Sequence, residues 1–303
     1  MALQQDRPEN NDSRRGFAFA MSAYALWGIM PLYMKALANV PALEILVHRV
    51  IWSLPIAALV ILITGRTKEL MQAFRTPKTL AMAGLTAVLI SVNWGIYVWA
   101  IANDHALDAA LGYYINPLFS VFLGAVLLGE RLTRRQQLAI SMAVLAVLIL
   151  TYEAGRLPLL SLGLPLTFGT YAYLKKSLPV GPNQGFFLEI LLLMPVALGY
   201  MAYLYVTDQT HFMIGNGLET ALLLGCGVIT AVPLLLYGNG AKHLRMSTNG
   251  FLQYSVPSMI FLMAVFVFHE PLGLGRLMAF GLIWAGLVLF SFDIFKKIPI
   301  NKS

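Results

Sequence analysis

Ten apolar segments, each about twenty residues long and separated by short connections, constrain this chain more than any other feature. A helix of that length crosses a hydrocarbon core about 30 Å thick, because each residue advances the helix by about 1.5 Å. The predicted spans cover residues 16–34, 44–64, 79–102, 107–128, 134–152, 157–174, 184–204, 218–238, 247–268 and 274–294. The sequence therefore predicts an all-α membrane protein with ten transmembrane helices.

The overall composition excludes an ordinary soluble domain. Hydrophobic residues make up 58% of the chain and charged residues only 12%, whereas soluble domains carry about 25% charged residues. The formal net charge of +7 would favour a nucleic-acid partner in a soluble protein, but in a membrane protein it is the placement of Lys and Arg that matters. We expect membrane lipid around the chain and no nucleic-acid partner.

The basic residues fall mainly on one side of the predicted membrane. Seventeen of the 21 Lys and Arg residues lie in segments 1–15, 65–78, 129–135, 175–183, 239–246 and 295–303, which would share one side. Only Lys35, Arg156 and Arg276 fall on the other side, and Arg49 lies within a span. Because cytoplasmic loops carry an excess of Lys and Arg, we predict that both termini are cytoplasmic. Residues 1–15 are expected to form a disordered tail and residues 295–303 a second cytoplasmic tail.

The chain also contains an internal duplication. The stretch 111–130 recurs 140 residues later at 251–270, where the matching residues are Tyr114 with Tyr254, Pro117 with Pro257 and Glu130 with Glu270. The same offset pairs Tyr97 with Tyr237, and an offset of 141 pairs Trp27 with Phe168. The first repeat is predicted over 16–152 and the second over 157–294. Five spans per repeat is an odd number, so the second repeat enters the membrane from the opposite face and the repeats are inverted.

Inverted repeats are typical of carriers that alternate between inward-open and outward-open states, with the substrate near the midplane where the repeats meet. A duplication can also simply build a helical bundle without transport. The duplication therefore favours a carrier and leaves a bundle without transport as the alternative.

Polar and aromatic side chains deep within the spans are the candidates for a substrate site, because polar groups are costly in hydrocarbon. Asn93, Tyr113, Asn116 and Gln253 are predicted to make polar contacts, and the walls are predicted to comprise Trp27, Trp94, Tyr114 and Tyr254. The other interpretation of Asn116 is that it satisfies the carbonyl of Tyr113, which Pro117 leaves without its helical donor.

Glu44, His48 and Arg49 open the second span and form a candidate outer gate or proton-coupling group. Glu44 and His48 are four residues apart, so they share a helix face, and the carboxylate would favour the charged imidazole. Arg49 could pair with Glu44 or Asp108. The alternative interpretation is a structural ion-paired cluster near the outer end.

Two prolines and two glutamates are the predicted hinges. Pro117 and Pro257 interrupt the helical hydrogen bonding of their spans. Glu130 and Glu270 end their helices at opposite membrane surfaces, and each is expected to set the angle to the next helix.

No motif for catalysis, metal binding or cofactor binding is present in the sequence, which lacks a phosphate-binding loop, a nucleophile elbow and a cysteine pair. We therefore predict no enzyme activity, no metal and no cofactor, and we interpret Cys226 as a small buried residue. Stretches of small residues such as 281–286 are interpreted as packing surfaces within the chain, so a monomer is favoured.

Several stretches resemble the RarD proteins, which belong to the EamA branch of the drug/metabolite transporter superfamily. They are 27–29 (WGI), 48–53 (HRVIWS), 93–94 (NW), 111–117 (LGYYINP) and 128–131 (LGER), within a similarity that runs over about 16–293. The resemblance implies two inverted five-helix repeats in a bacterial inner membrane. Members of the wider superfamily export amino acids and other small metabolites, and the RarD name is associated with chloramphenicol sensitivity.

The expected function is a secondary transporter, an exporter of small metabolites and of drugs such as chloramphenicol, with a small-molecule substrate and protons as a candidate coupling ion. The chain lacks an ATP site, so uphill transport would use an ion gradient. The alternatives are a sensor or scaffold that binds a ligand without moving it, and a lipid flippase.

Overall fold

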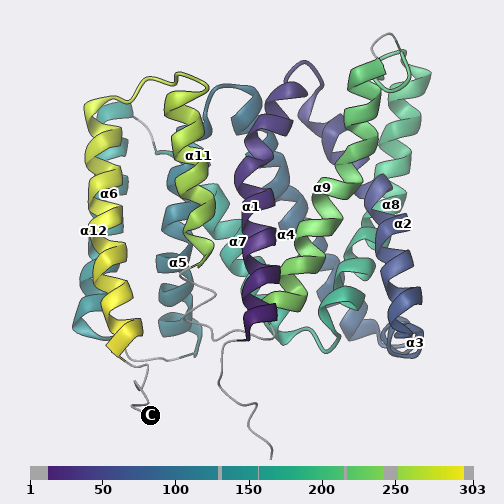
Figure 1. Ribbon diagram of the computed structural model, residues 1–303, viewed down its shortest axis with the longest axis horizontal. Helices are drawn as coiled ribbons and strands as arrows, with labels where there is room; N and C mark the ends of the chain where they lie inside the picture. The colour runs from purple at the N-terminus through teal and green to yellow at the C-terminus, as the bar shows by residue number, and fades with distance from the viewer. Residues whose placement is uncertain (1–12, 129–131, 156, 215–216, 242–251, 297–303) are drawn as a thin grey trace, which may run out of the picture.

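The computed structural model describes residues 13–128, 132–155, 157–214, 217–241 and 252–296. Within these residues the chain forms eleven helices and no strand, which confirms the all-α prediction for this part (Figure 1). The helices are α1 (Arg14–Ala36), α2 (Ala42–Thr64), α3 (Thr67–Phe74), α4 (Pro77–Ala102), α5 (Ala106–Leu128), α6 (Arg134–Ala154), α7 (Leu159–Ser177), α8 (Pro182–Val206), α9 (Gly217–Ala241), α11 (Ser255–Phe266) and α12 (Leu274–Lys296). The predicted hinge Glu130 and most of the two predicted tails lie outside the described residues.

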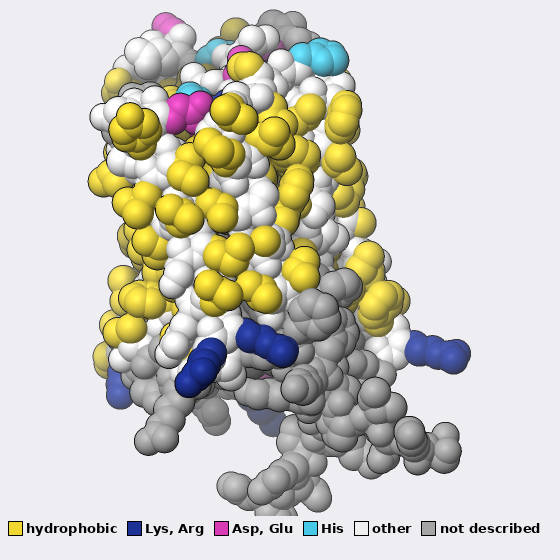
Figure 2. Space-filling view, turned by 90° about the vertical axis from the view of Figure 1, so that its left-hand side faces the viewer, with side chains coloured by type: hydrophobic (Ala, Val, Ile, Leu, Met, Phe, Trp, Pro, Cys, Tyr) yellow, Lys and Arg dark blue, Asp and Glu magenta, His cyan; other side chains and the backbone are white. Residues whose placement is uncertain are grey.

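Every predicted span overlaps one of these helices. Six of them, α1, α2, α4, α6, α8 and α9, are long and apolar enough to cross a membrane by length and composition. The space-filling view of the side formed by α6 and α12 has a broad hydrophobic band (Figure 2). Lys and Arg gather below that band, and acidic and His side chains gather above it. The chain is therefore a multi-pass membrane protein.

Helix α3 was not expected from the sequence. It lies in the connection after α2, and only Leu70 and Ala73, three residues apart on one face, are buried. A helix of eight residues is too short to cross a bilayer. It therefore lies at the end of the bundle, where Gln184 of α8 donates a hydrogen bond to Glu69 at 2.5 Å.

The helix pairs that pack most extensively follow a regular pattern. They are α6 with α12, α5 with α7 and α11, α1 with α9 and α11, α2 with α8 and α9, and α4 with α7 and α8. The pattern is symmetric between the two predicted repeats. Exchanging the five long helices of the first repeat with those of the second, in chain order, leaves this set of pairs unchanged; the exchange is α1 with α7, α2 with α8, α4 with α9, α5 with α11 and α6 with α12. Figure 1 shows α6 and α12 at one side of the bundle, α2 and α8 at the other, and α1, α4, α7 and α9 between them.

A close backbone approach fixes α2 against α9. A Cβ atom at Gly227 would lie 2.2 Å from the carbonyl oxygen of Trp52, so only glycine fits there. The hydroxyl of Ser53 donates to the Gly227 carbonyl at 3.4 Å at the same contact. This approach sets the distance between α2 and α9.

The ninth predicted span is interrupted rather than kinked. Residues 252–253 are helical, Tyr254 lies in a turn, and α11 begins at Ser255. Pro257 therefore lies in the first turn of α11, where its missing N–H is not needed by the helix. The turn is consistent with the expected interruption of helical hydrogen bonding at Pro257, whereas Pro117 lies inside the continuous helix α5.

Candidate functional site

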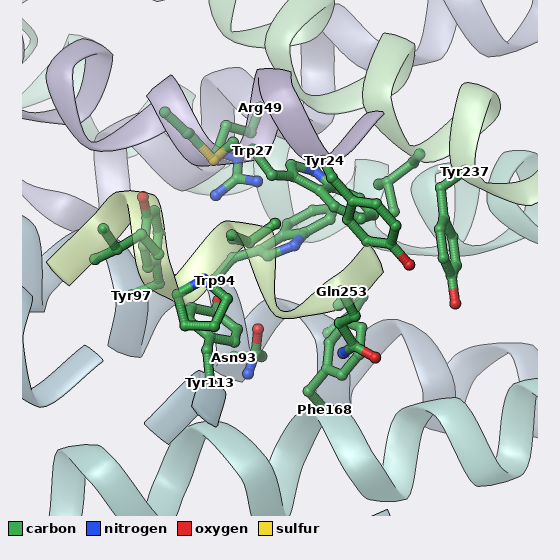
Figure 3. Close-up of a pocket in the computed structure, with 16 residues that line it drawn as sticks. Tyr24, Trp27, Arg49, Asn93, Trp94, Tyr97, Tyr113, Phe168, Tyr237 and Gln253 are labelled. Carbon is green, nitrogen blue, oxygen red and sulfur yellow. The ribbon is translucent and has the colours of Figure 1, made fainter. Parts of the chain in front are cut away.

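A cavity lies near the centre of the bundle, where seven helices meet (Figure 3). It measures about 80 Å³ on a scale on which one buried water takes about 10–15 Å³. Its lining comprises Tyr24, Trp27 and Met30 of α1, Arg49 of α2, Ile90, Asn93, Trp94 and Tyr97 of α4, Tyr113 of α5, Phe168 of α7, Leu234 and Tyr237 of α9, and Gln253, Val256, Pro257 and Ile260 at and before α11. Most of these side chains are aromatic or apolar, so the cavity suits a small molecule with an apolar body.

Five of the eight predicted substrate-binding residues line this cavity. They are Trp27, Asn93, Trp94, Tyr113 and Gln253. The predicted hinge Pro257 and the predicted gate residue Arg49 line it as well. These residues lie up to 230 positions apart in the chain, and helix packing brings them together.

The other three predicted binding residues do not line the cavity. The Tyr114 hydroxyl lies 2.6 Å from that of Ser258, and its ring packs edge-on against Phe280 and Trp284. Asn116 is buried beside Gly169 of α7, and the ring of Tyr254 packs against the main apolar core. Adjacent residues of a helix point about 100° apart, so Tyr113 faces the cavity and Tyr114 does not.

The sequence-based set of site residues missed several lining aromatics. Tyr24, Trp27 and Tyr237 form a cluster with ring centroids 5.4–5.9 Å apart. The duplication could have indicated more of them, because repeat partners of lining residues also line the cavity. These pairs are Trp27 and Phe168 at an offset of 141, and Trp94 and Leu234, Tyr97 and Tyr237, and Tyr113 and Gln253 at an offset of 140.

Asn93 fixes α4 to α7 at the level of the cavity. Its amide donates to the carbonyl of Leu164 at 3.0 Å and to the hydroxyl of Thr167 at 2.9 Å. The side chain is only 1% exposed. Because both acceptors lie on one helix, Asn93 holds the wall between the two predicted repeats.

Arg49 points from α2 into the space among Trp27, Trp94 and Tyr97 (Figure 3). Its Nε donates to the Thr230 hydroxyl at 2.9 Å, and its guanidinium carbon lies 4.4 Å from the centre of the Trp94 ring. Neither predicted carboxylate partner, Glu44 or Asp108, contacts it. Arg49 therefore belongs to the cavity rather than to an ion-paired outer cluster.

The expected Glu44–His48 pair is not formed. The buried Glu44 carboxylate accepts from the Thr210 hydroxyl at 3.1 Å and from the backbone amide of His211 at 2.7 Å, and it pairs with the His211 ring at 2.7 Å. His48 instead accepts from Trp52 Nε1 at 2.9 Å. The partner that replaced His48 comes from the connection between α8 and α9, which the spacing along α2 could not reveal.

Glu270, a predicted hinge, lies at the end of the bundle where α1 finishes, which is also the end that holds Glu44. Its carboxylate accepts from the amides of Ala106 and Leu107 at 2.7 and 3.0 Å, and thus caps the start of α5. Burial raises the pKa of this carboxyl above its ordinary value of 4.5. Nearby, Arg276 contacts Asp108 at 3.3 Å. We call these contacts, together with that of Glu44, the outer-end contacts.

No group of three metal-ligating side chains occurs among the described residues. The free thiol of Cys226 is buried.

Residues 14–152 match the EamA-like transporter family. The chain is 40% identical over 284 residues to a protein RarD of Streptomyces exfoliatus, covering 93% of this chain and 90% of that one. It is 30% identical over 285 residues to a chloramphenicol-sensitive protein RarD of Pseudomonas aeruginosa, covering 93% and 95%.

A solved crystal structure has the same fold. It superposes with a TM-score of 0.61 at 18% identity, covering 92% of this chain and 98% of its own. The chain therefore belongs to the EamA-like transporter family, as a relative of the RarD proteins in the drug/metabolite transporter superfamily, whose members are transporters rather than enzymes.

Proposed function

We propose that the protein is a secondary transporter that exports small metabolites across the bacterial inner membrane by alternating access. The observation that carries this proposal is the central cavity, whose lining is drawn from both predicted repeats and contains residue pairs at the repeat offset. A site between two repeats is what an alternating carrier needs, because rocking one repeat against the other exposes it to each side in turn.

The proposed topology has ten spans, inverted repeats at 16–152 and 157–294, and both termini in the cytoplasm. The packing pattern supports it, because exchanging the two sets of five helices reproduces the observed pairs. The distribution of charge supports the orientation. Among the described residues, Arg14, Arg66, Arg134 and Lys175 lie at the end where α1 begins, whereas Lys35 and Arg276 lie at the other end.

In this proposal the outer end is closed and the inner end is the one that opens next. At the end where α1 finishes, Glu44 and Glu270 join the two repeats through short hydrogen bonds, and Glu153 of α6 accepts from the amide of Gly275 at 3.2 Å. At the other end, the described parts of the two repeats meet through the hydrogen bond from Gln184 to Glu69 and through a buried apolar cluster in which Leu70 and Leu188 take part. The outer-end contacts thus act as the closed outer gate in this proposal.

The gate proposal differs from the sequence-based one in its residues. Glu44 and His211 form the pair that breaks when the outer end opens. His48 packs next to them, with its ring centroid 4.8 Å from that of Phe212. A carboxylate paired with a histidine can exchange a proton when the pair separates. Protons therefore remain the candidate coupling ion, through Glu44 and His211.

Counterflow tests the proposal directly. Proteoliposomes are loaded with an unlabelled panel of tyrosine, chloramphenicol and phenylacetate, and the uptake of each labelled compound is followed. A carrier gives transient accumulation of at least one labelled compound above its equilibrium level. Saturable binding of the panel without any exchange would refute transport and favour a sensor, and translocation of a fluorescent lipid without exchange would favour a flippase.

A further inference from the structure

Arg49 carries a charge that the described part of the protein does not neutralise. Its side chain is 2% exposed within an apolar bundle, where an isolated charge is costly. Its contacts with Thr230 and with the Trp94 ring involve no anion. None of the ion pairs between described residues includes Arg49.

The buried carboxylates of the described chain are occupied elsewhere. Glu44 is held by Thr210 and His211, and Glu270 is held by two amides at the start of α5. Glu189 accepts from Thr86 at 2.8 Å and pairs with Lys175 at 2.6 Å. None of them is free to serve as the counter-ion of Arg49.

Two hydrogen-bond donors in the cavity lack a partner. The Nη1 atom of Arg49 and the hydroxyl of Tyr97 are both buried, and neither makes a hydrogen bond within the described residues. Both side chains line the cavity (Figure 3). A buried donor without an acceptor costs about 1–3 kcal/mol, and more when it is charged, so such groups are usually paired in a functional state. An acceptor with negative charge would satisfy both donors and neutralise the guanidinium.

We propose that the cavity binds the carboxylate of a small aromatic acid, with Arg49 and Tyr97 holding the carboxylate and the aromatic walls holding the ring. The guanidinium is matched to a carboxylate by its planar fork of donors. Trp27, Trp94 and Tyr113 supply flat apolar surface for the ring. This inference rests on the proposed transport function and specifies its substrate class.

The cavity also discriminates against an amino group. No Asp or Glu occurs among the described residues that line it, so an ammonium group would find no charged partner among them. A substrate with a single negative charge is therefore preferred over a zwitterion or a cation, which separates aromatic acids from aromatic amino acids.

The second repeat does not duplicate this anion site. Arg49 and Glu189 are each the eighth residue of α2 and α8, and they lie 140 residues apart. The residue that corresponds to Arg49 in the second repeat is thus an acid that is already paired with Lys175. Among the described residues the cavity accordingly has one anion site, so we expect one substrate molecule per protein.

Binding by the purified full-length protein tests the assignment with three probes of similar shape. Phenylacetate is an anion, phenylacetamide is its neutral analogue, and phenethylamine is a cation. Wild type is expected to bind phenylacetate at least about 30-fold more tightly than phenylacetamide, because losing one partner of a buried charged pair typically weakens binding by that much or more. Phenethylamine is expected not to bind. A rise in melting temperature reports binding to the folded protein.

Variants separate recognition from stability. Arg49→Met is expected to remove the preference for phenylacetate and Arg49→Lys to retain part of it. Tyr97→Phe is expected to weaken phenylacetate more than phenylacetamide, because a hydrogen bond to a charged acceptor is the stronger one. Arg134→Gln removes an exposed charge of α6 and is the control, expected to bind as wild type does. If Arg49→Met fails to fold, Tyr97→Phe still tests the site, because it removes only the hydroxyl.

Three outcomes would overturn the assignment: equal binding of the acid and the amide, no binding of phenylacetate by wild type, or a site that prefers chloride over phenylacetate. Counterflow of tyrosine or chloramphenicol that does not depend on Arg49 would remove this inference and leave the proposed transporter standing. Absence of counterflow for every compound, with phenylacetate binding intact, would instead refute transport.

Discussion

Weakening the outer-end contacts should open the cavity toward the outside. Glu44 is fully buried and accepts three hydrogen bonds from Thr210 and His211. Glu44→Gln keeps the shape of the side chain but replaces one acceptor oxygen by a donor and removes the negative charge. We expect the inward-facing state to lose stability relative to the outward-facing state.

The size of the effect follows from the number of hydrogen bonds. A hydrogen bond to a charged group contributes about 1.5–3 kcal/mol net. The bonds from the Thr210 hydroxyl and the His211 amide are better shielded from solvent than the bond from the His211 ring, because that ring is 36% exposed. Glu44→Gln should therefore cost about 2 kcal/mol and Glu44→Ala about 4 kcal/mol. Since 1.4 kcal/mol is a factor of ten, the outward-facing population should rise about 30-fold in Glu44→Gln.

A cysteine in the cavity measures that population. Cys226→Ala removes the single native thiol, and Tyr113→Cys then places a reporter in the cavity wall. An impermeant maleimide added outside right-side-out vesicles reacts only when the outer end is open. Glu219→Gln, on the first turn of α9 and outside the outer-end contacts, is the control and should react as the parent does.

Unchanged labelling in both Glu44→Gln and Glu44→Ala, with normal melting temperatures, would refute the gate. Faster labelling in Glu219→Gln as well would show that charge at this end, rather than the specific contacts, sets the equilibrium.

The remaining predictions concern the outer cap and helix packing. Burial raises the pKa of Glu270 above 4.5, so protonation favours the closed state, fully below about pH 4.5 and less as pH rises through the raised pKa. Outside labelling of the Tyr113→Cys reporter, divided by the labelling of the denatured protein at the same pH, should therefore increase over that range, and Glu270→Gln should remove this increase. Gly227→Ala should lower the melting temperature, at a cost of about 1–3 kcal/mol, because its Cβ would meet backbone, whereas Gly199→Ala, with open space, should not. Asn93→Ala should cost about 1–2 kcal/mol by the same measurement, because it removes two hydrogen bonds between α4 and α7, and an unchanged melting temperature would contradict that role.

The sequence alone determined which segments are helical and which of their ends carry the basic residues. Length and hydropathy are properties of a local segment, and a run of about twenty apolar residues must satisfy its backbone polar groups within a helix in lipid. Pro257 indicated that the hydrogen bonding of the ninth span is interrupted, but the turn at Tyr254 and the short helix α3 could not be located from hydropathy, which reports neither a turn inside an apolar run nor an eight-residue helix in a polar connection.

Only the tertiary structure decided which face of each helix meets the cavity and which charges pair. Tyr113 and Tyr114 are indistinguishable by depth, yet only Tyr113 lines the cavity. Glu44 was free to pair with His48 on its own helix, but His211, 167 positions away, took that place. Rotation about a helix axis and contacts between distant segments depend on how the helices pack, and local pattern does not contain that information.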